Sequence, residues 1–444
     1  MNSIAALHLV SWRPSAQMVL GALGAALLVL LGPGRAGADT IAADDPNIQY
    51  VGRFDQTTPT APAFDWSHSC IRANFQGTSC SVILDGISKY FDVYVDGGNP
   101  WSVMSGNSGV ETLPVVSGLS NGVHAVALYR RDEAGKGLNT FLGFVLDTGK
   151  ALVAPDAPPF RRMEFIGDSY TCGYGVLGAY GSSFSYATED ACLSYAGLMA
   201  SHYHADCMVT AWTGEGMVRN YGDPNQTSAY PLPYYYPRTC GSVSNSATWT
   251  FNWQPDVVVI NLGLNDFFTS PQPTEAQFVG GYSNFLTTVR GYYPNADIIC
   301  TCLCQMLGSA GDYISTVVST FGDRKVHFAY IDYVLMNPTD LGSDEHPNTW
   351  GQTIIADAFI PVFDGIMGAS WAYSPPQLQI SLSPPNALVF AWSFPIAGCL
   401  LQTNASLAAT NWVTLANAPV ASGSNYQMTM PAPAGLTFYR LKLP

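Results

Sequence analysis

Short apolar segments recur through the middle of the chain and alternate with longer stretches of helical spacing. Five of them have the length and composition of buried strands: Met163–Ile166, Cys207–Ala211, Val257–Leu262, Ile298–Cys302 and Val326–Ile331. After the third, Thr274-Glu275-Ala276-Gln277 is a capping box that predicts the start of a helix. A last helix is predicted over Thr349–Met367. Strands that alternate with helices predict a parallel sheet covered by helices on both faces.

The regions before and after this part have the shorter period of β-strands. From Ile48 to about Asp147, short alternating apolar segments are separated by turn signals such as Asp96-Gly97-Gly98 and Asn121-Gly122. This spacing predicts an all-β sandwich or jelly roll. The tail after Pro375-Pro376 is also rich in predicted strands, so we expect a third, smaller β domain there.

These patterns divide the chain into four parts. We expect a signal peptide over residues 1–38, a β domain over 45–155, an α/β domain over 158–370 and an all-β module over 376–444. The leader is indicated by Arg13, the apolar run Met18–Leu31 and the small residues Ala36-Gly37-Ala38. Because this run is short and ends in Gly32-Pro33-Gly34, we expect cleavage and secretion rather than stable membrane insertion.

Charge and cysteine content narrow the classes of partner. The chain has 18 Lys plus Arg against 32 Asp plus Glu, a net charge of −14. A surface of that sign repels phosphate backbones, so we expect no nucleic-acid partner. All ten cysteines follow the leader, and none has the spacing of zinc ligands, so we expect no metal site. Buried thiols and disulfides both fit these cysteines, and their pairing stays open.

Four short motifs follow predicted strands or precede the last helix. They are Gly167-Asp168-Ser169, Thr213-Gly214, Gly263-Leu264-Asn265-Asp266 and Asp344-Glu345-His346. Each of them fits an ordinary turn when it is taken alone. Because the carboxyl ends of parallel strands meet at one edge of a sheet, we expect the four motifs to form a single site there.

The residue types in these motifs are those of nucleophilic acyl transfer. Ser169 is the predicted nucleophile and His346 its general base. The N–H groups of Ser169 and Gly214 and the side-chain amide of Asn265 are the predicted oxyanion hole. This chemistry needs no metal and no cofactor.

With these motifs the chain resembles the SGNH, or GDSL-like, hydrolases, whose four blocks supply Ser169, Gly214, Asn265 and His346 here. Residues 48–370 are most similar to carbohydrate esterase family 2, of the acetyl-xylan esterase type. The resemblance implies a jelly-roll domain followed by an SGNH hydrolase domain with a flavodoxin-like parallel sheet. It further implies a secreted esterase that removes O-acetyl groups from acetylated polysaccharide or oligosaccharide, such as xylan or glucomannan.

One departure from the wider superfamily concerns the partner of the histidine. The superfamily usually has an aspartate three residues before the histidine, where this chain has Ser343, while Asp344 is two residues before. Family 2 esterases are similar in holding the histidine by a main-chain carbonyl, a role that the resemblance assigns to Asp344. Glu345 stands where relatives can have a sugar-binding aromatic residue. Two interpretations of the four tyrosines of one loop stay open: they replace this aromatic residue as a platform for sugar, or they pack the loop onto the domain. These tyrosines are Tyr230, Tyr234, Tyr235 and Tyr236.

Two other functions remain open from the sequence. The first is an esterase of the same class that acts on lipid, thioester or other acyl substrates. The second is a non-catalytic carbohydrate-binding or adhesion protein whose β domains carry the function. In the tail, which resembles small β modules of secreted bacterial proteins, we expect Trp392 and Trp412 to be core residues.

Overall fold

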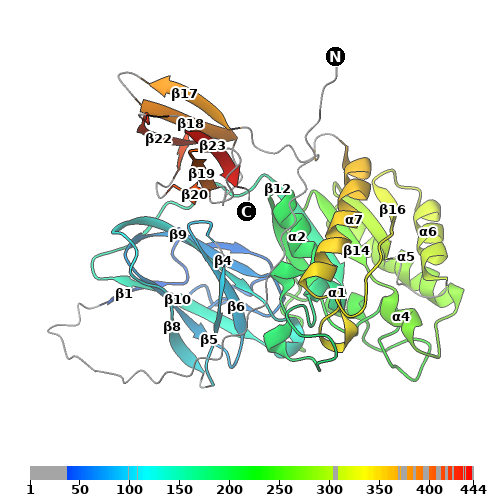
Figure 1. Ribbon diagram of the computed structural model, residues 1–444. Coiled ribbons are helices and arrows are strands. Elements are labelled where there is room, and N and C mark those ends of the chain that lie inside the picture. Colours follow the sequence, from blue (N-terminus) through cyan, green and yellow to red (C-terminus); the bar gives the residue numbers. More distant parts are fainter. Residues whose placement is uncertain are drawn as a thin grey trace, which may run out of the picture. The chain divides into compact units, whose positions relative to one another are not determined.

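The computed structural model of the chain describes residues 38–98, 100–107, 109–303, 309–368 and 371, and shorter stretches of the tail (Figure 1). Those stretches are 378–383, 387–393, 400–406, 412–415, 419–422, 425–433, 435 and 437–442. The predicted leader lies outside the described residues, except for Ala38. Cys304, Cys399 and Pro375-Pro376 also lie outside them.

The first domain is a sandwich of two antiparallel sheets, as predicted. Its strands are β1 (Ala38–Ala42), β2 (Gln49–Val51), β3 (Ala63–Phe64), β4 (Cys70–Gly77), β5 (Cys80–Asp85), β6 (Tyr90–Val95), β7 (Trp101–Met104), β8 (Val110–Val116), β9 (Gly122–Arg130), β10 (Asn139–Asp147) and β11 (Leu152–Val153). One sheet has the order β1-β10-β5-β8 with β3 beside β10, and the other has β11-β4-β9-β6-β7 with β2 beside β4. Alternate residues of these strands point inward, and Phe75, Phe91 and Phe144 are fully buried between the sheets.

The second domain has one parallel sheet of five strands. They are β12 (Arg161–Gly167), β13 (Ala205–Ala211), β14 (Val257–Asn261), β15 (Asp297–Leu303) and β16 (Val326–Ile331), in the order β13-β12-β14-β15-β16. This is the flavodoxin-like order, and all five predicted strands are confirmed. The side chains of β13, β14 and β15 are almost all buried, which explains why these strands appear in the sequence as largely apolar runs.

Helices connect these strands and cover the sheet. They are α1 (Ser169–Cys172), α2 (Tyr195–His202), α3 (Leu232–Tyr235), α4 (Leu264–Phe268), α5 (Glu275–Tyr292), α6 (Ala310–Phe321) and α7 (Thr349–Met367), with 3-10 turns η1 (Ala134–Lys136), η2 (Tyr186–Thr188), η3 (Ala191–Leu193) and η4 (Ser343–Glu345). The predicted capping box at Thr274 starts α5, and α7 has the predicted bounds. Helices α2 and α7 pack together on one face, and α5 and α6 pack on the other (Figure 1).

The register of the sheet brings the strand ends to one level. Gly167 at the end of β12 pairs with Ala211 of β13 and with Asn261 of β14. The loops that follow these three strands therefore start side by side at the same edge. Those loops contain the first three predicted motifs.

The tail forms two small antiparallel sheets. Its strands are β17 (Gln379–Ser383), β18 (Ala387–Ser393), β19 (Leu400–Asn404), β20 (Val413–Thr414), β21 (Val420–Ser422), β22 (Asn425–Pro431) and β23 (Phe438–Lys442). Trp392 is buried beside Phe390, so its prediction as a core residue is confirmed. The prediction for Trp412 is wrong, because Trp412 precedes the short edge strand β20 and stays half-exposed. The guanidinium of Arg440 lies 4.4 Å from its ring centroid.

A buried ion pair joins the first two domains. Arg53 follows β2, Glu164 lies within β12, and both side chains are fully buried. Arg53 Nη2 donates to Glu164 Oε1 at 3.0 Å, while Nη1 donates to the main-chain oxygens of Tyr236 and Arg238. The Arg53 guanidinium also lies 4.7 Å from the centroid of the Tyr236 ring. The pair is thus fully enclosed by groups of both domains.

Removing one member of this pair should strongly destabilise the protein. In the Arg53→Met variant the Glu164 carboxylate would stay buried without its cation, which costs about 3–5 kcal/mol of unfolding free energy. Urea denaturation measures this cost. As a control, Lys325→Met removes an exposed ion pair with Asp297 and should cost less than about 1 kcal/mol. Equal midpoints for the two variants would contradict the prediction.

The described cysteines form no disulfides with one another. The eight described cysteines, at positions 70, 80, 172, 192, 207, 240, 300 and 302, are all free. Seven of the eight are buried, so burial rather than disulfide formation accounts for them.

None of the described helices has the length and apolar character needed to cross a membrane.

Candidate active site

Ser169 is presented by a sharp turn from strand to helix. It is the first residue of the one-turn helix α1, and Asp168 caps that turn by accepting the Tyr170 N–H at 3.1 Å. Gly173 ends the turn in the left-handed region with φ 72°. The Ser169 hydroxyl lies 2.9 Å from His346 Nε2, so the structure brings together two residues that are 177 positions apart.

The second ring nitrogen of His346 faces a main-chain oxygen. Nδ1 lies 3.1 Å from the carbonyl oxygen of Asp344, which requires that Nδ1 carries the proton and donates it. Asp344 has φ 46° and Glu345 φ 60°, an uncommon conformation for two successive non-glycine residues. The Asp344 carboxylate turns away from the ring and accepts from Tyr174 Oη at 2.8 Å and from the Phe184 N–H at 3.1 Å.

Ser343 stands where the wider superfamily has an aspartate, and it has no contact with His346 through its side chain. It is fully buried, and its hydroxyl lies 2.9 Å from the Ser182 hydroxyl. A Cβ on Gly178 would lie 1.8 Å from the Ser343 hydroxyl, so this contact is tight. Among the described residues, the His346 Nδ1 partner is therefore the Asp344 carbonyl and not a carboxylate.

The two backbone N–H groups of the predicted oxyanion hole are available to a ligand. None of the hydrogen bonds of the described residues uses the N–H of Ser169 or of Gly214. Gly214 has φ 80°, and a Cβ there would meet only the Cβ of Tyr221, at 4.0 Å. Glycine is thus required at this position by the backbone conformation rather than by space.

The Asn265 amide has a different setting from the one expected. Its Nδ2 donates to the Glu215 carbonyl at 2.8 Å and lies 3.4 Å from Asp168 Oδ2. One amide proton is therefore used to tie α4 to the loop of Gly214. The second amide proton has only the long contact with Asp168, so it is the one that can donate to an oxyanion.

Asp266, next in the chain, anchors the loop that carries Gly214. Its carboxylate accepts from the N–H groups of Met217, Val218 and Arg219 at 2.8–2.9 Å. Burial raises the pKa of Asp266 to about 6, although these three donors act in the opposite direction. Asp266 was not among the site residues predicted from the sequence. A buried carboxyl group needs hydrogen-bond donors. The position of Asp266 just after an apolar strand was therefore the sequence signal for such a role.

Burial governs the electrostatics of the site. It lowers the pKa of His346, against the Asp344 contacts that raise it, so the neutral imidazole is favoured. Burial and the nearby charge of Asp266 raise the pKa of Asp168 to about 7. Burial and Glu133 raise the pKa of Glu215 to about 8. The serine thus lies beside a base that burial keeps neutral, and burial also favours the protonated form of Asp168 and Glu215.

Exposed aromatic rings flank this edge of the sheet. Tyr221, whose N–H donates to the Gly214 carbonyl, is 57% exposed, and Phe268 at the end of α4 is 54% exposed. Their ring centroids are 5.7 Å apart. Tyr221 lies seven residues after Gly214, and Phe268 lies two residues after Asp266, so proximity to these motifs was the available sequence signal. Of the four loop tyrosines considered from sequence, Tyr230 and Tyr234 are exposed, Tyr235 is half-buried and Tyr236 is fully buried.

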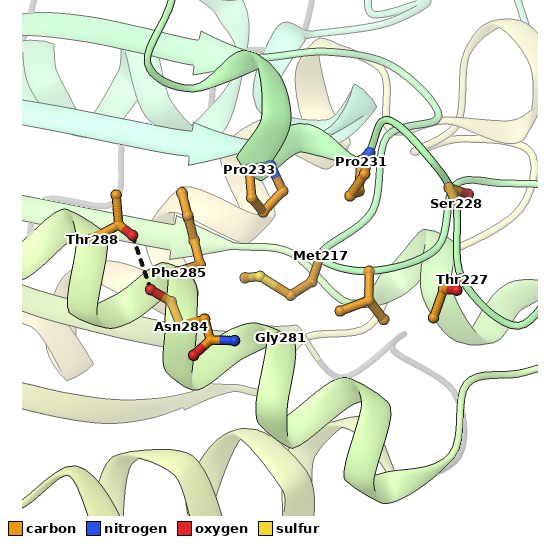
Figure 2. A pocket seen from close by; sticks show the side chains of 10 residues that line it. Met217, Thr227, Ser228, Pro231, Pro233, Gly281, Asn284, Phe285 and Thr288 are labelled. Atoms are coloured by element: carbon orange, nitrogen blue, oxygen red, sulfur yellow. Dashed lines mark hydrogen bonds between the residues drawn. The ribbon is translucent and has the colours of Figure 1, made fainter.

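A shallow cavity of about 360 Å³ lies behind the Gly214 loop (Figure 2). Met217 and Pro231 line it from the loop, and Phe285 and Asn284 line it from α5. Its lining includes none of the four motif residues Ser169, Gly214, Asn265 and His346. The site with the predicted chemistry therefore lies at the edge of the sheet and outside this cavity.

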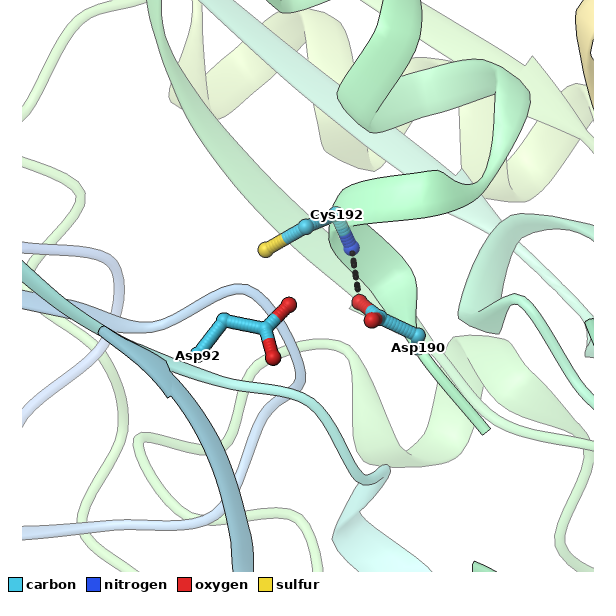
Figure 3. Close-up of side chains that lie close together, drawn as sticks. All are labelled: Asp92, Asp190 and Cys192. Atoms are coloured by element: carbon cyan, nitrogen blue, oxygen red, sulfur yellow. Dashed lines mark hydrogen bonds between the residues drawn. The ribbon is translucent and has the colours of Figure 1, made fainter. Parts of the chain in front are cut away.

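Two groups of acidic residues with a cysteine have the proximity of metal ligands. In one, Asp92, Asp190 and Cys192 meet at the junction of the two domains (Figure 3). Asp190 already accepts the Cys192 N–H at 2.9 Å, and Arg131 Nε lies 3.3 Å from its other oxygen. The guanidinium supplies the positive charge that these carboxyl groups require, so we assign no metal to them. The other group is Glu133, Cys172 and Glu189.

Comparisons with known proteins agree on both domains. Residues 50–155 match the profile described as "Carbohydrate esterase 2 N-terminal", and residues 165–354 match the "GDSL-like Lipase/Acylhydrolase family". A solved family two carbohydrate esterase from Clostridium thermocellum, in complex with cellohexaose, is 34% identical. It superimposes with a TM-score of 0.67 over 73% of this chain and 100% of that one.

Two curated proteins are also similar. The cellulase/esterase CelE of Acetivibrio thermocellus is 39% identical over 331 residues, which cover 71% of this chain and 39% of that protein. An acetylxylan esterase/glucomannan deacetylase of Cellvibrio japonicus is 28% identical over 336 residues, 74% of this chain and 91% of that protein. The chain thus spans less than half of the first relative and most of the second.

Proposed function

The chain belongs to the family 2 carbohydrate esterases, and on this premise we propose that it removes O-acetyl groups from polysaccharide by a Ser-His mechanism. The observation that carries the proposal is the 2.9 Å contact between Ser169 Oγ and His346 Nε2. It lies at the sheet edge where two free N–H groups are also available. Xylan or glucomannan is the proposed backbone, because the Cellvibrio japonicus relative is named for both.

Acylation begins with Ser169. Its oxygen forms a bond to the acetyl carbonyl carbon while its proton moves to His346 Nε2. The charge that develops on the carbonyl oxygen is stabilised by the N–H groups of Ser169 and Gly214 and by the Asn265 amide proton that has only the 3.4 Å contact with Asp168. The tetrahedral intermediate collapses when the sugar oxygen leaves and takes the proton from His346. The acetyl group is then an ester of Ser169.

Deacylation repeats the sequence with water. His346 removes a proton from a water molecule, whose oxygen attacks the acetyl-Ser169 carbonyl in the same oxyanion hole. The bond to Ser169 Oγ breaks, Ser169 regains the proton from His346, and acetate leaves. The Asp344 carbonyl keeps the imidazole in the tautomer with the proton on Nδ1 throughout.

A pair of variants at Asp344 distinguishes a carbonyl partner from a carboxylate partner. Asp344→Asn keeps an oxygen for Tyr174 and Phe184, and asparagine tolerates the left-handed conformation, so we expect kcat within about threefold of the original. A triad carboxylate would instead lose about 10⁴-fold in kcat in this substitution. Asp344→Ala removes both contacts and should cost about tenfold, since the strained backbone then lacks its support. Hydrolysis of an aryl acetate measures both.

The exposed aromatic rings support a polymeric substrate. Sugar rings present apolar faces that pack on flat aromatic side chains, and Tyr221 and Phe268 offer such faces next to the proposed oxyanion donors. Glu345 lies at the position where relatives can have a sugar-binding aromatic residue. Tyr221 and Phe268 are our candidates for the rings that take the place of that residue.

Removing the Tyr221 ring should therefore affect the polymer alone. For Tyr221→Ala we expect KM for acetylated polysaccharide to rise about threefold to tenfold, the equivalent of about 0.5–1.5 kcal/mol. KM for an aryl acetate should not change. Tyr330→Ala, which removes a ring that is 51% exposed on β16, is the matched control. Equal effects on both substrates would argue against a sugar contact.

The proposed activity is tested by acetate release from acetylated xylan, acetylated glucomannan and an aryl acetate. Release from one of the polymers is the expected result and identifies the backbone. Turnover of the aryl acetate alone would keep the serine esterase and direct the search to lipid, thioester or other acyl substrates. No turnover, with retained polysaccharide binding, would favour the non-catalytic binding protein.

We further propose that the protein is exported after cleavage near residue 38. The basic, apolar and small-residue segments of the leader support this. Mass spectrometry of the protein from its own host would reveal the mature N-terminus. A mature protein that retains residues 1–38 would contradict the proposal.

A further inference from the structure

A side chain of the N-terminal β domain reaches the loop that carries Gly214. Glu133 follows β9, precedes η1 and is 5% exposed. Its Oε2 accepts the N–H of Thr213 at 2.6 Å. Thr213 is the residue directly before Gly214, so a contact across 80 positions joins the β domain to the proposed oxyanion hole.

This contact anchors the start of the loop. Before Thr213, the Trp212 N–H donates to the Gly167 carbonyl of β12 at 3.2 Å. Further along the loop, Asp266 accepts from the N–H groups of Met217, Val218 and Arg219. Between these two points the Thr213 N–H is held by Glu133 and the Glu215 carbonyl by Asn265. Of the four attachments, only the one to Glu133 comes from the other domain.

Glu133 is itself held firmly. Its N–H donates to Glu189 Oε2 at 3.1 Å, and its carbonyl accepts from Arg130 Nη2 at 3.1 Å. Nearby, Gly135 packs on Trp212, since a Cβ on Gly135 would lie 2.9 Å from the indole nitrogen. Burial raises the pKa of Glu133, against the Thr213 contacts that lower it. Because Glu133 is fixed by these contacts, its carboxyl group fixes the position of Thr213.

We propose that Glu133 is a positioning residue for the oxyanion hole, so that the β domain completes the active site of the esterase. This inference rests on the proposed function, because it assigns the Gly214 N–H to the oxyanion. Donors of this kind must be held within about 0.5 Å of their productive position. Loss of the Glu133 contact would let Thr213 and Gly214 move, and the transition state would lose more stabilisation than the bound substrate.

The test compares three variants with an aryl acetate as substrate. In Glu133→Ala we expect kcat to fall about tenfold to a hundredfold, with KM within about twofold. Glu133→Gln keeps an oxygen that can accept from Thr213 and should retain most of kcat. Arg72→Gln is the matched control, because it removes another contact between the domains, with Asp206, far from the motif loops. Its kcat should not change.

Coupling to Asn265 separates a role in the oxyanion hole from a general role in folding. If both residues act on one developing charge, the loss in the double variant Glu133→Ala/Asn265→Ala should be clearly smaller than the product of the two single losses. A fully multiplicative loss would overturn the inference. Unchanged kcat in a folded Glu133→Ala protein would overturn it too, as would an equal fall in kcat for Arg72→Gln.

Two further measurements keep the test decisive. If Glu133→Ala does not fold, Glu133→Asp withdraws the carboxyl group from Thr213 by one methylene and should show the same fall in kcat with KM retained. An Asp variant as active as the original would contradict the inference. Turnover by the unaltered protein is measured alongside: its absence would defeat the proposed function, whereas turnover that Glu133 variants leave unchanged would defeat only this inference.

Discussion

Replacing Ser169 with alanine should abolish ester hydrolysis. The attacking oxygen is lost, and we expect kcat for an aryl acetate to fall by about four orders of magnitude or more. The N–H of residue 169 remains, and so does the tight turn capped by Asp168, so the variant should still fold and bind oligosaccharide. A fluorophosphonate that labels the original protein should not label the variant. Ser319→Ala, an exposed serine on α6, is the control and should keep full activity.

Two outcomes would contradict this expectation in different ways. Residual turnover near the original level would mean that Ser169 is not the nucleophile. Loss of turnover together with loss of folding would leave the role of Ser169 unresolved by kinetics, and labelling of the unaltered protein, with identification of the modified residue, would then decide it.

Replacing His346 with alanine should have the next largest effect. Without a base within reach of the Ser169 hydroxyl, kcat should fall by about three to four orders of magnitude. The pH profile offers a second measurement. Because burial lowers the pKa of His346, the neutral base persists below its ordinary pKa of about 6.5. The kcat/KM of the unaltered protein should therefore fall only as the pH drops below about 6.5.

The residual activity of the His346→Ala variant should lack this inflection. An inflection that remains would belong to another group, for example Asp266, whose pKa is raised to about 6. The folded state favours neutral His346, so protonation also reduces stability as the pH falls. Circular dichroism over the same range would separate unfolding from loss of the base.

The sequence was sufficient for most of the fold because the buried elements have strong patterns. The strand Val257–Asn261 is buried on both faces and is apolar from Val257 to Ile260, and the capping box at Thr274 marks the start of α5. Both signals are local. Trp412 was mispredicted because its environment depends on a short strand at the edge of a sheet and on Arg440, 28 positions away.

The structure brings together the predicted residues that follow strand ends, whereas several contacts between loops were not predicted. Ser169, Gly214 and Asn265 follow strands that lie in register, so parallel topology alone brings their loops together. The contacts of Tyr174 with Asp344 and of Glu133 with Thr213 join residues 170 and 80 positions apart. Such pairs leave no periodic signal in one sequence, because they depend on how loops and domains pack.

The buried thiols give this protein an internal reporter of local opening. Burial raises the pKa of Cys70, in the β domain, and of Cys300, in the central sheet, to about 12, so neither is reactive in the native state. A thiol reagent can modify each cysteine only when its surroundings transiently unfold. The rate of alkylation at each position would then measure how often the two domains open, and whether they open together or one at a time.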